Sequence, residues 1–515
     1  MKTHRIMFLL AAALYCVLSA LAAVPSAPPL DVVERAQHRG KEIVDLAITA
    51  LGGEEALRGI NNVTLAESGQ TTPRLQMPTP SGPNEAGTFE EQLTLDLKNS
   101  RLLVKNQGAG AGFQFNAVNV IKGGEGSAFD LRARTVTPIP SATATSPAFV
   151  QYYRRLPHLL LRQALDRSGT VRYLGDDTFN GRKHNVITFV MADGSQIAMF
   201  VDAGTNLISK YEQVFTDPLL GDRAAAVVYG PYSASGNTKV PSGFDLIQAG
   251  DVVTRLKYTA VKFNSTLDDK MFEPKTEGFV AAKAAPPGGP EAVNKLADGV
   301  FLLENVAGPN QNMLAVEFKD YILVVEAPGT SAGTATAVAK IKEAIPGKPI
   351  RYVVPTHHHG DHIGGLRTLM AEDATVVTTP GNRWVIEAEA AAPIRDALAR
   401  NPRKPKIEVI QNKKRVFEDE SQRVEILDVG PNSHAKEMLI AYLPKQKLIF
   451  QGDLFIAPLN DAPVGPAQPT TVDFAKRVKE LGLQVERIAG VHGKLATWPD
   501  VEQAVASSQR PVTGQ

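Results

Sequence analysis

Cysteine is almost absent from this chain of 515 residues, and neither sign of charge dominates it. The single cysteine, Cys16, lies in an apolar N-terminal segment that we expect to be removed. The mature chain would then have no thiol, which excludes disulfide bonds and thiolate metal ligands. With 55 basic and 54 acidic residues, the formal net charge is +1. This balance gives no electrostatic reason to expect binding to nucleic acid or to an anionic membrane surface.

Aromatic residues are also scarce, at 6% of the chain, whereas 42 glycines and 35 prolines indicate many loops. The length is sufficient for two or three domains with hydrophobic cores of their own. Residues 1–24 are typical of a signal peptide, because Lys2 and Arg5 precede an apolar run that ends in the small residues Ala20-Leu21-Ala22. The alternative is an uncleaved membrane anchor, but the proline-rich stretch that follows favours cleavage. We therefore expect a periplasmic or secreted protein with no stable membrane insertion.

Residues 25–283 are expected to form an antiparallel, β-rich α+β domain. A helical pattern over 32–60 is interrupted at Gly52-Gly53, and a second helix is expected at 152–165. Between and after them lie short alternating runs typical of strands, with a hairpin signal at Asp193-Gly194. The expected strands are 89–97, 101–104, 171–174, 184–191, 196–201, 207–215, 226–229 and 252–263.

The layout of this domain resembles the bacterial lipoprotein-carrier fold, an open half-barrel with an apolar interior. The resemblance implies a groove for an apolar ligand or an envelope partner. A structural domain that shields or positions a neighbouring site is the alternative. His158 and His184 are isolated in this region, and we interpret both as ordinary residues of the fold. An Ala-, Pro- and Gly-rich stretch then predicts a linker at 284–295, before a second domain over 296–515.

The second domain contains the strongest motif of the chain, His357-x-His359-x-Asp361-His362. It follows an apolar run at 350–354 that predicts a buried strand, and a short helix is expected at 364–371. The motif therefore lies on a strand-to-helix loop, where a rigid scaffold presents functional side chains. Imidazoles and a carboxylate are ligands that zinc and similar divalent ions prefer. A loose histidine-rich surface tract is the alternative interpretation.

This stretch resembles the signature of the metallo-β-lactamase-fold hydrolases, and the resemblance extends over residues 296–505. The later ligands of that family are matched in order by His434, Asp453 and His492. The resemblance implies a four-layer αβ/βα sandwich that holds two divalent metal ions. One ion would be held by His357, His359 and His434, and the other by Asp361, His362 and His492, with Asp453 bridging the two ions.

The same resemblance implies an exported dinuclear hydrolase in which a metal-bridging hydroxide attacks an ester, lactone, thioester or related bond of a small molecule. Asp361 is the expected catalytic residue, which orients the nucleophile or accepts its proton. Zinc is the first expectation, and manganese or iron also suits this ligand set. A carboxylate in place of a bridging cysteine argues against a dedicated antibiotic hydrolase. The alternative is an envelope ligand-binding protein whose N-terminal groove binds an apolar ligand, with a structural or degenerate metal domain.

Further expectations concern the surroundings of this motif. Glu326 follows a buried run at 321–325, where the family usually has a supporting aspartate that is one methylene shorter. His358 is expected to point away from the metals, and Lys494 to be a solvated lysine that could attract an anionic substrate. Specificity is expected from the loops 402–406 and 456–469. The remaining expected strands are 300–303, 313–318, 374–378, 423–429, 437–443, 447–451 and 486–491, and the remaining helices are 334–345, 382–400 and 473–481, the last with Asp473 as its N-cap.

Overall fold

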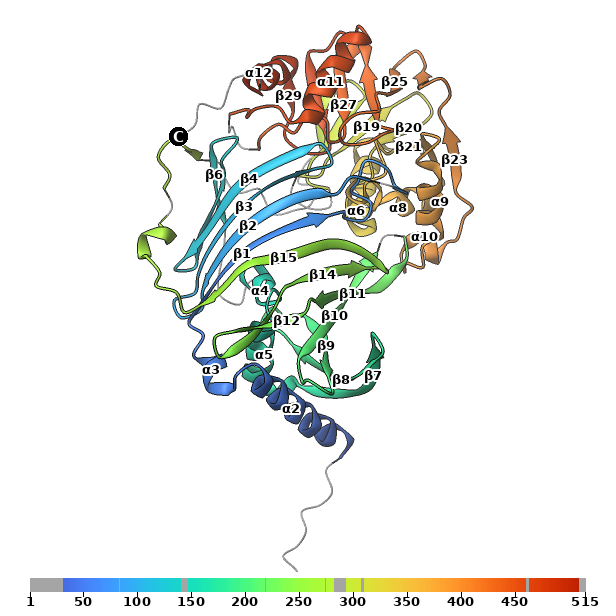
Figure 1. Ribbon diagram of the computed structural model, residues 1–515. Coiled ribbons are helices and arrows are strands. Elements are labelled where there is room, and N and C mark those ends of the chain that lie inside the picture. The colour runs from blue at the N-terminus through green and yellow to red at the C-terminus, as the bar shows by residue number, and fades with distance from the viewer. Residues whose placement is uncertain are drawn as a thin grey trace, which may run out of the picture.

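The computed structural model describes residues 31–82, 84–139, 147–217, 219–273, 275–281, 293–306, 310–459 and 463–508. The expected signal peptide lies outside these ranges, as does the expected linker except for its last residues. Those last residues belong to a strand of the second domain. No helix in the described ranges combines the length and apolar character needed to cross a membrane. Figure 1 shows two parts, a strongly curved sheet formed by the first half of the chain and a layered α/β body formed by the second half.

The first helix in the described part of the chain, α2 (Val32–Ala50), begins at the residue expected from the sequence. The Asp31 carboxylate accepts a hydrogen bond from the Glu34 backbone N–H at 2.8 Å, and the Glu34 carboxylate accepts one from the Asp31 N–H at 3.0 Å. This reciprocal pair is a capping box, which satisfies donors that a helix N-terminus leaves free. The side of α2 that carries Gly40 lies against the chain at Val171, where an added Cβ would be 2.9 Å from a methyl carbon.

A single sheet of 14 strands forms the framework of the N-terminal domain, and nearly all neighbouring pairs in it are antiparallel. The strand order is β16-β6-β5-β4-β3-β2-β1-β15-β14-β11-β10-β9-β8-β7. The strands of this domain are β1 (Asn62–Thr71), β2 (Gly87–Asp96), β3 (Arg101–Gly110), β4 (Phe113–Lys122), β5 (Glu125–Asp130), β6 (Thr135–Ile139), β7 (Arg172–Phe179), β8 (Arg182–Val190), β9 (Gln196–Asp202), β10 (Ile208–Asp217), β11 (Gly221–Tyr229), β12 (Tyr232–Ser235), β13 (Thr238–Pro241), β14 (Gly243–Gln248), β15 (Asp251–Phe263) and β16 (Val280–Ala281). β12 and β13 form a separate hairpin.

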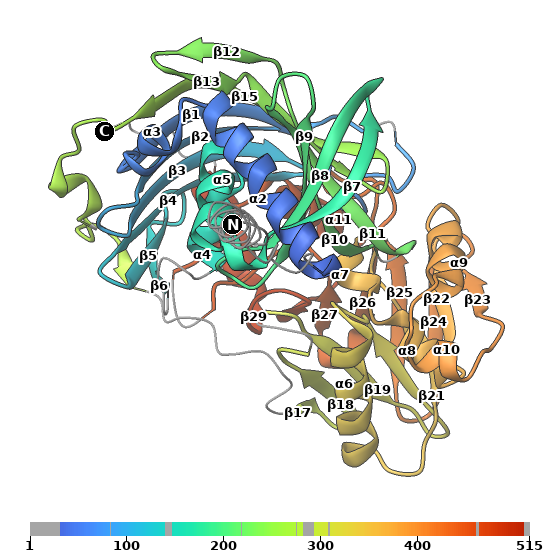
Figure 2. The ribbon, with the colours of Figure 1, turned by 90° about the horizontal axis from the view of Figure 1, so that it is seen from below.

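Helices fill the concave face of this sheet (Figure 2). They are α2, α3 (Glu54–Arg58), α4 (Pro147–Tyr153) and α5 (Pro157–Asp166), with the 3₁₀ turn η1 (Ser168–Thr170) nearby. The other 3₁₀ turn, η2 (Asp269–Phe272), lies against β3 and β4, where Phe272 is buried in a separate cluster with Leu103 and Val120. Phe149, Leu160 and Leu161 are fully buried in one core with the inward side chains of the strands. The apolar interior suggested by the sequence is therefore occupied by helices of the chain itself.

The C-terminal domain has four layers, as the sequence analysis predicted. A seven-stranded sheet in the order β17 to β23 packs against a six-stranded sheet in the order β24 to β29, and one apolar core lies between them. A second core lies between the first sheet and α6, α8, α9 and α10, and a third lies between the other sheet and α11 and α12.

The strands of this domain are β17 (Val293–Ala297), β18 (Val300–Leu303), β19 (Met313–Glu317), β20 (Ile322–Val325), β21 (Ile350–Val354), β22 (Thr375–Thr378), β23 (Lys406–Val409), β24 (Lys414–Glu418), β25 (Arg423–Asp428), β26 (Leu439–Leu443), β27 (Leu448–Gln451), β28 (Arg487–Gly490) and β29 (Ala496–Thr497). The helices are α6 (Ser331–Ala344), α7 (Gly360–Ile363), α8 (Leu366–Ala371), α9 (Arg383–Ala391), α10 (Ala397–Arg400), α11 (Pro469–Glu480) and α12 (Trp498–Ser508), with the 3₁₀ turn η3 (Pro444–Gln446).

The start of α11 differs from the sequence expectation. The helix begins at Pro469, with Gln468 at the N-cap, rather than at Asp473. Proline suits the first helical position, because its fixed φ is helical and its missing N–H is not needed there. The Asp473 carboxylate instead accepts a hydrogen bond from the backbone N–H of Ser433 at 2.9 Å. Asp473 therefore holds the loop that carries His434, the expected metal ligand.

Candidate metal centre

All seven side chains that the sequence predicted as metal ligands come together at one end of the C-terminal sheets. His357 and His359 follow β21, Asp361 and His362 lie on the single turn α7, and the others follow later strands. His434 lies between β25 and β26, Asp453 follows β27, and His492 follows β28. Their ligand atoms form two groups that share Asp453, and within each group these atoms lie within 4.8 Å of one another.

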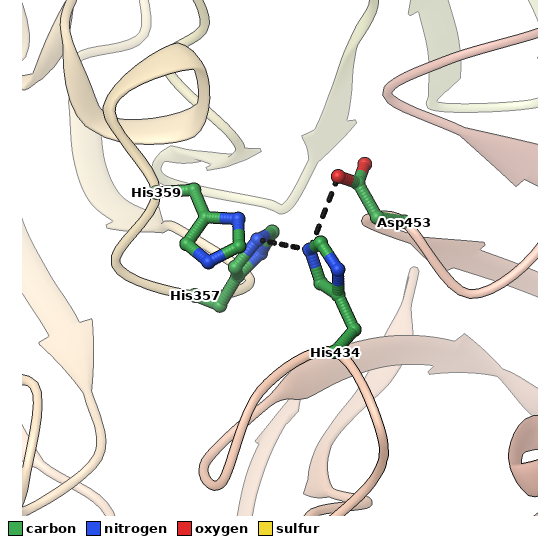
Figure 3. A group of neighbouring side chains, drawn as sticks. All are labelled: His357, His359, His434 and Asp453. Atoms are coloured by element: carbon green, nitrogen blue, oxygen red, sulfur yellow. Dashed lines mark hydrogen bonds and ion pairs between the residues drawn. The ribbon is translucent and has the colours of Figure 1, made fainter. Parts of the chain in front are cut away.

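The first group consists of His357, His359, His434 and Asp453, all of them buried. Figure 3 shows the three imidazoles and the carboxylate facing one another. The Nε2 atoms of His357 and His434 are 3.1 Å apart, and His434 Nε2 is 3.2 Å from Asp453 Oδ2. The outer nitrogen of each ring contacts the protein. Thr356 Oγ1 lies 3.1 Å from His357 Nδ1, and the carbonyl oxygens of Met77 and Ala111 accept hydrogen bonds from His359 Nε2 and His434 Nδ1.

The second group consists of Asp361, His362, Asp453 and His492. Asp453 Oδ1 lies 3.2 Å from His362 Nε2 and 3.3 Å from His492 Nε2. Asp361 Oδ2 is 3.3 Å from the same His492 nitrogen. The outer nitrogen of His492 donates to the carbonyl oxygen of Asn310 at 2.6 Å. The two oxygens of Asp453 therefore face different groups, as a bridging carboxylate requires.

The donor set fits a pair of divalent ions. His359 Nδ1, His362 Nε2 and Asp453 Oδ1 are buried and make no hydrogen bond, although a buried polar atom is normally satisfied. These atoms point inward, and the outer nitrogen of His359 is used for a hydrogen bond to the backbone. A metal-bound imidazole typically has such a partner on its second nitrogen, since this partner fixes the tautomer and the ring orientation.

The protonation states of these side chains also bear on metal binding. Burial and the neighbouring rings of His362 and His359 lower the pKa of His357 well below its ordinary value, so the ring is neutral and its lone pair is free. Burial alone would raise the pKa of Asp453, but the charge of His362 and the contact with His434 hold that pKa well below its ordinary value. Burial also lowers the pKa of His359, whereas at His362 and His492 the nearby carboxylates outweigh burial and raise the pKa above its ordinary value. Metal binding therefore has to displace a proton from these two rings.

Glu326, at the end of β20, supports the loop that carries the motif at 357–362. It is fully buried, and its Oε1 accepts a hydrogen bond from the backbone N–H of Thr356 at 2.8 Å. Its Oε2 lies 3.4 Å from Nδ1 of His362, the outer nitrogen of that ligand. Its backbone has a φ of +79°, which is uncommon for a residue with a side chain and is found at sites held by their surroundings. The longer glutamate thus reaches both the loop and a ligand.

A cleft of about 400 Å³ opens beside Asp453, between the two domains. Its lining from the N-terminal domain includes Phe113 and Arg132, and its lining from the C-terminal domain includes Phe455, Ile456 and Leu459. The described part of the loop 456–469 lines this cleft, and its role in specificity stays a prediction. The loop 402–406 does not line it and instead leads into β23 at the edge of the first sheet, where Lys406 pairs with Asp373.

Two residues near the motif do not join either group. His358 is buried and donates from Nε2 to the Met77 carbonyl oxygen at 2.9 Å, which agrees with the expectation that it points away from the metal positions. Lys494 is half-buried and is not part of the cleft lining. Gln76, Met77 and Ala111, which come from the other domain, were not predicted to contact the centre. The one available signal was the long proline-rich connection at 72–86, because long loops in compact domains are often functional.

Comparison with known proteins agrees with this description. Residues 310–492 match the family model described as Metallo-beta-lactamase superfamily. This range begins at Asn310 and ends at His492, so it contains all seven expected ligand positions. The C-terminal part of the chain is therefore a metallo-β-lactamase superfamily domain, and a β-rich region precedes it. The comparisons do not support the resemblance of that region to a lipoprotein carrier.

Solved metallo-β-lactamases are similar to part of this chain. The enzyme from Pseudomonas aeruginosa in its mono-zinc form is 22% identical, and the match covers 43% of this chain and 96% of that one with a TM-score of 0.33. The protein from Hirschia baltica is 22% identical, with 42% and 97% covered and a TM-score of 0.33. The protein from Erythrobacter litoralis is 21% identical, with 44% and 98% covered and the same TM-score of 0.33.

Proposed function

We propose that this protein is an exported, dinuclear metal-dependent hydrolase that cleaves an ester, lactone, thioester or related bond of a small molecule. The observation that carries the proposal is the pair of ligand groups that share the Asp453 carboxylate. His357, His359 and His434 would hold one ion, and Asp361, His362 and His492 would hold the other. Nitrogen and carboxylate ligands without thiolate suit zinc, and they also suit manganese or iron.

A bound pair of such ions supplies Lewis acidity and lowers the pKa of water to near neutrality. Asp361 is the residue of this centre best placed to act on water and substrate, because 30% of its side chain is exposed. The side chains of Asp453 and His492 are only 10% and 14% exposed, and that of His362 is fully buried. In the proposed mechanism the Asp361 carboxylate orients the attacking water or accepts its proton.

The cleft beside Asp453 supports a substrate with an apolar group next to the scissile bond. Phe455, Ile456 and Leu459 line one wall, and 41% of the Ile456 surface remains exposed there. Small-molecule sites are typically concave, of a few hundred Å³, and lined mostly by apolar side chains. The proposed substrate is therefore an acyl compound whose alkyl or aryl part lies in this cleft while its carbonyl group faces the metal positions.

Export is part of the same proposal. It is supported by the signal-peptide pattern at residues 1–24 and by the absence of cysteine from the remainder of the chain. A protein without disulfide bonds must rely on its core alone, which suits a bacterial periplasm or exterior.

Metal content is the first test of this function. The purified wild-type protein is expected to contain about two ions per chain by elemental analysis, and Asp453→Ala is expected to contain fewer because it loses the shared ligand. Hydrolysis of a p-nitrophenyl ester should stop after chelation and return when zinc is added. A wild-type protein with fewer than one ion per chain, or activity that survives complete chelation, would refute the proposal.

The substrate class is tested with p-nitrophenyl acetate, butyrate, hexanoate and octanoate. Each CH₂ that enters the cleft is expected to raise kcat/KM about fourfold, since burying it is worth about 0.8 kcal/mol. Ile456→Ser should reduce the increase in kcat/KM from acetate to octanoate. Val472→Ser is the control, because it changes an exposed aliphatic side chain that does not line the cleft. A series that is already flat in the wild-type protein would count against the apolar subsite and leave the metal chemistry intact.

A further inference from the structure

A loop of the N-terminal domain lies inside the C-terminal domain, next to the metal-binding motif. It is the connection between β1 and β2, and in Figure 1 it extends from the blue strands toward α6 and α8. The side chain of Leu75 is 8% exposed and packs in the core between the first C-terminal sheet and its helices. The carbonyl oxygens of Leu75 and Pro78 accept hydrogen bonds from the backbone N–H groups of Gly360 and Lys436 at 3.0 and 2.9 Å.

The two residues between these anchor points contact the expected metal ligands directly. Nε2 of Gln76 donates to Asp361 Oδ1 at 2.6 Å. The Met77 carbonyl oxygen accepts hydrogen bonds from His359 Nε2 at 3.0 Å and from His358 Nε2 at 2.9 Å. The bonds to Asp361 and from His359 leave a second atom of each residue, Asp361 Oδ2 and His359 Nδ1, facing the metal positions.

A second loop of the same domain reaches the third histidine. The turn between β3 and β4 places the Ala111 carbonyl oxygen 2.8 Å from His434 Nδ1, and the Phe113 ring meets the His434 ring edge-on at 5.1 Å. Gly112, between them, has a φ of +81°, and an added Cβ would lie 2.6 Å from the Thr470 side chain and 2.8 Å from the Ser433 backbone. Only glycine fits this approach of the two domains.

We propose that the N-terminal domain is a structural part of the metal centre and that Gln76 is a positioning residue for the second ion. The inference rests on the proposed metal-dependent function. With its amide bonded to Oδ1, Gln76 fixes the rotation of the Asp361 carboxylate, so that Oδ2 faces His492 and the second ion. Because Gln76 does not contact the first group, its effect is confined to the second ion. Groups that orient a metal ligand in this way are typically worth 10- to 100-fold in metal affinity.

The test uses the full-length protein with Gln76→Met, which keeps the length and volume of the side chain but removes the N–H donor. Affinities for the two ions are measured by competition with a chromogenic chelator, and the absorption spectrum is recorded during titration of the metal-free protein with cobalt. We expect the second ion to bind about 10- to 100-fold more weakly and the first ion to keep its wild-type affinity. The cobalt bands of the second site should change, and those of the first should not.

Ser81→Ala is the matched control, because Ser81 lies in the same loop and is exposed. It should leave both affinities and the ester hydrolysis unchanged. Wild-type affinity for both ions in Gln76→Met would overturn the assignment of Gln76 while leaving the proposed function standing. An equal loss at both sites would also overturn it, since that result indicates a general structural role. A wild-type protein that binds no metal would refute the proposed function itself, together with this inference.

Discussion

Acid should destabilise the N-terminal domain through one buried histidine, His158 on α5. Its Nε2 lies 2.8 Å from the Thr238 hydroxyl, which itself donates to the Leu51 carbonyl oxygen, so Nε2 carries the hydrogen and donates. Its Nδ1 is buried and has no hydrogen-bond partner. A second proton would therefore be placed on a nitrogen with no acceptor, and burial lowers the pKa of His158 from 6.5 to about 4.

The sign of the effect follows from proton linkage. The unfolded chain binds a proton on this ring below about pH 6.5, whereas the folded chain does so only below about pH 4. The contribution of the neutral ring to the free energy of unfolding is therefore complete above about pH 6.5 and is lost between about pH 6.5 and pH 4. The loss approaches about 3 kcal/mol below pH 4. At pH 5 the same two pKa values give a loss of about 2 kcal/mol relative to pH 8.

The assay compares the wild-type protein with His158→Gln, whose amide can still donate to Thr238 but does not titrate. Urea unfolding followed by circular dichroism gives the free energy of unfolding at pH 8 and pH 5. The stability difference between the two proteins should shift by about 2 kcal/mol in favour of the variant at pH 5. Tryptophan fluorescence reports the other domain, because both tryptophans, Trp384 and Trp498, lie there.

Leu160→Val on the same helix removes buried volume without a titratable group, and its destabilisation should be the same at both pH values. If the difference between wild-type and His158→Gln is also constant from pH 8 to pH 5, the linkage argument for His158 is refuted.

Three further predictions concern the metal centre. Glu326→Gln should lower the affinity for the second ion by about 10- to 100-fold in a chelator competition, because it replaces the carboxylate beside the outer nitrogen of His362. An unchanged affinity would show that Glu326 does not support His362. Gly452→Ala should lower the metal-to-protein ratio and the Tm, because its Cβ would lie 2.5 Å from Thr356 Oγ1 and 3.2 Å from His357 Nδ1. Overpacking of this kind typically costs about 1–3 kcal/mol. A wild-type metal-to-protein ratio in this variant would show that the loop relaxes at no cost. Chelation should lower the free energy of unfolding by about 4 kcal/mol when the metal was at about a thousand times its Kd, and equal stability with and without chelator would contradict metal binding by the folded state.

The side chains of the candidate centre could be singled out from the sequence because four of them lie in one short motif and the family resemblance supplies the order of the other three. The four-layer arrangement was predicted from the family resemblance, and apolar runs such as 321–325 and 350–354 predicted only the individual buried strands. The N-terminal sheet was less predictable. β1 and β4 mix polar and apolar residues without strict alternation, and they are recognisable as strands only because their neighbours in the sheet pair with them.

The supporting residues of the site could not be predicted for a different reason. Gln76 and Asp361 are 285 positions apart in the sequence, and His434 and Ala111 are 323 positions apart. Their contacts depend on how two domains meet, and no local pattern encodes that. Asp473 shows the same limit on a smaller scale. An aspartate before an apolar period is a good helix start, yet here its carboxylate serves the His434 loop, and the helix begins four residues earlier.

The way the β1–β2 connection is anchored also indicates whether it can open. Opening the β1–β2 connection would expose Leu75 and break two backbone hydrogen bonds, those from Gly360 and Lys436. Exposing a buried leucine costs about 1.5–3 kcal/mol, and each lost hydrogen bond adds roughly 1 kcal/mol. An opening that costs several kcal/mol leaves well under 1% of molecules open, since every 1.4 kcal/mol is a factor of ten. The loop therefore behaves as a fixed wall of the centre rather than as a lid, and separate cavities open beside Asp453 and beside Asp361.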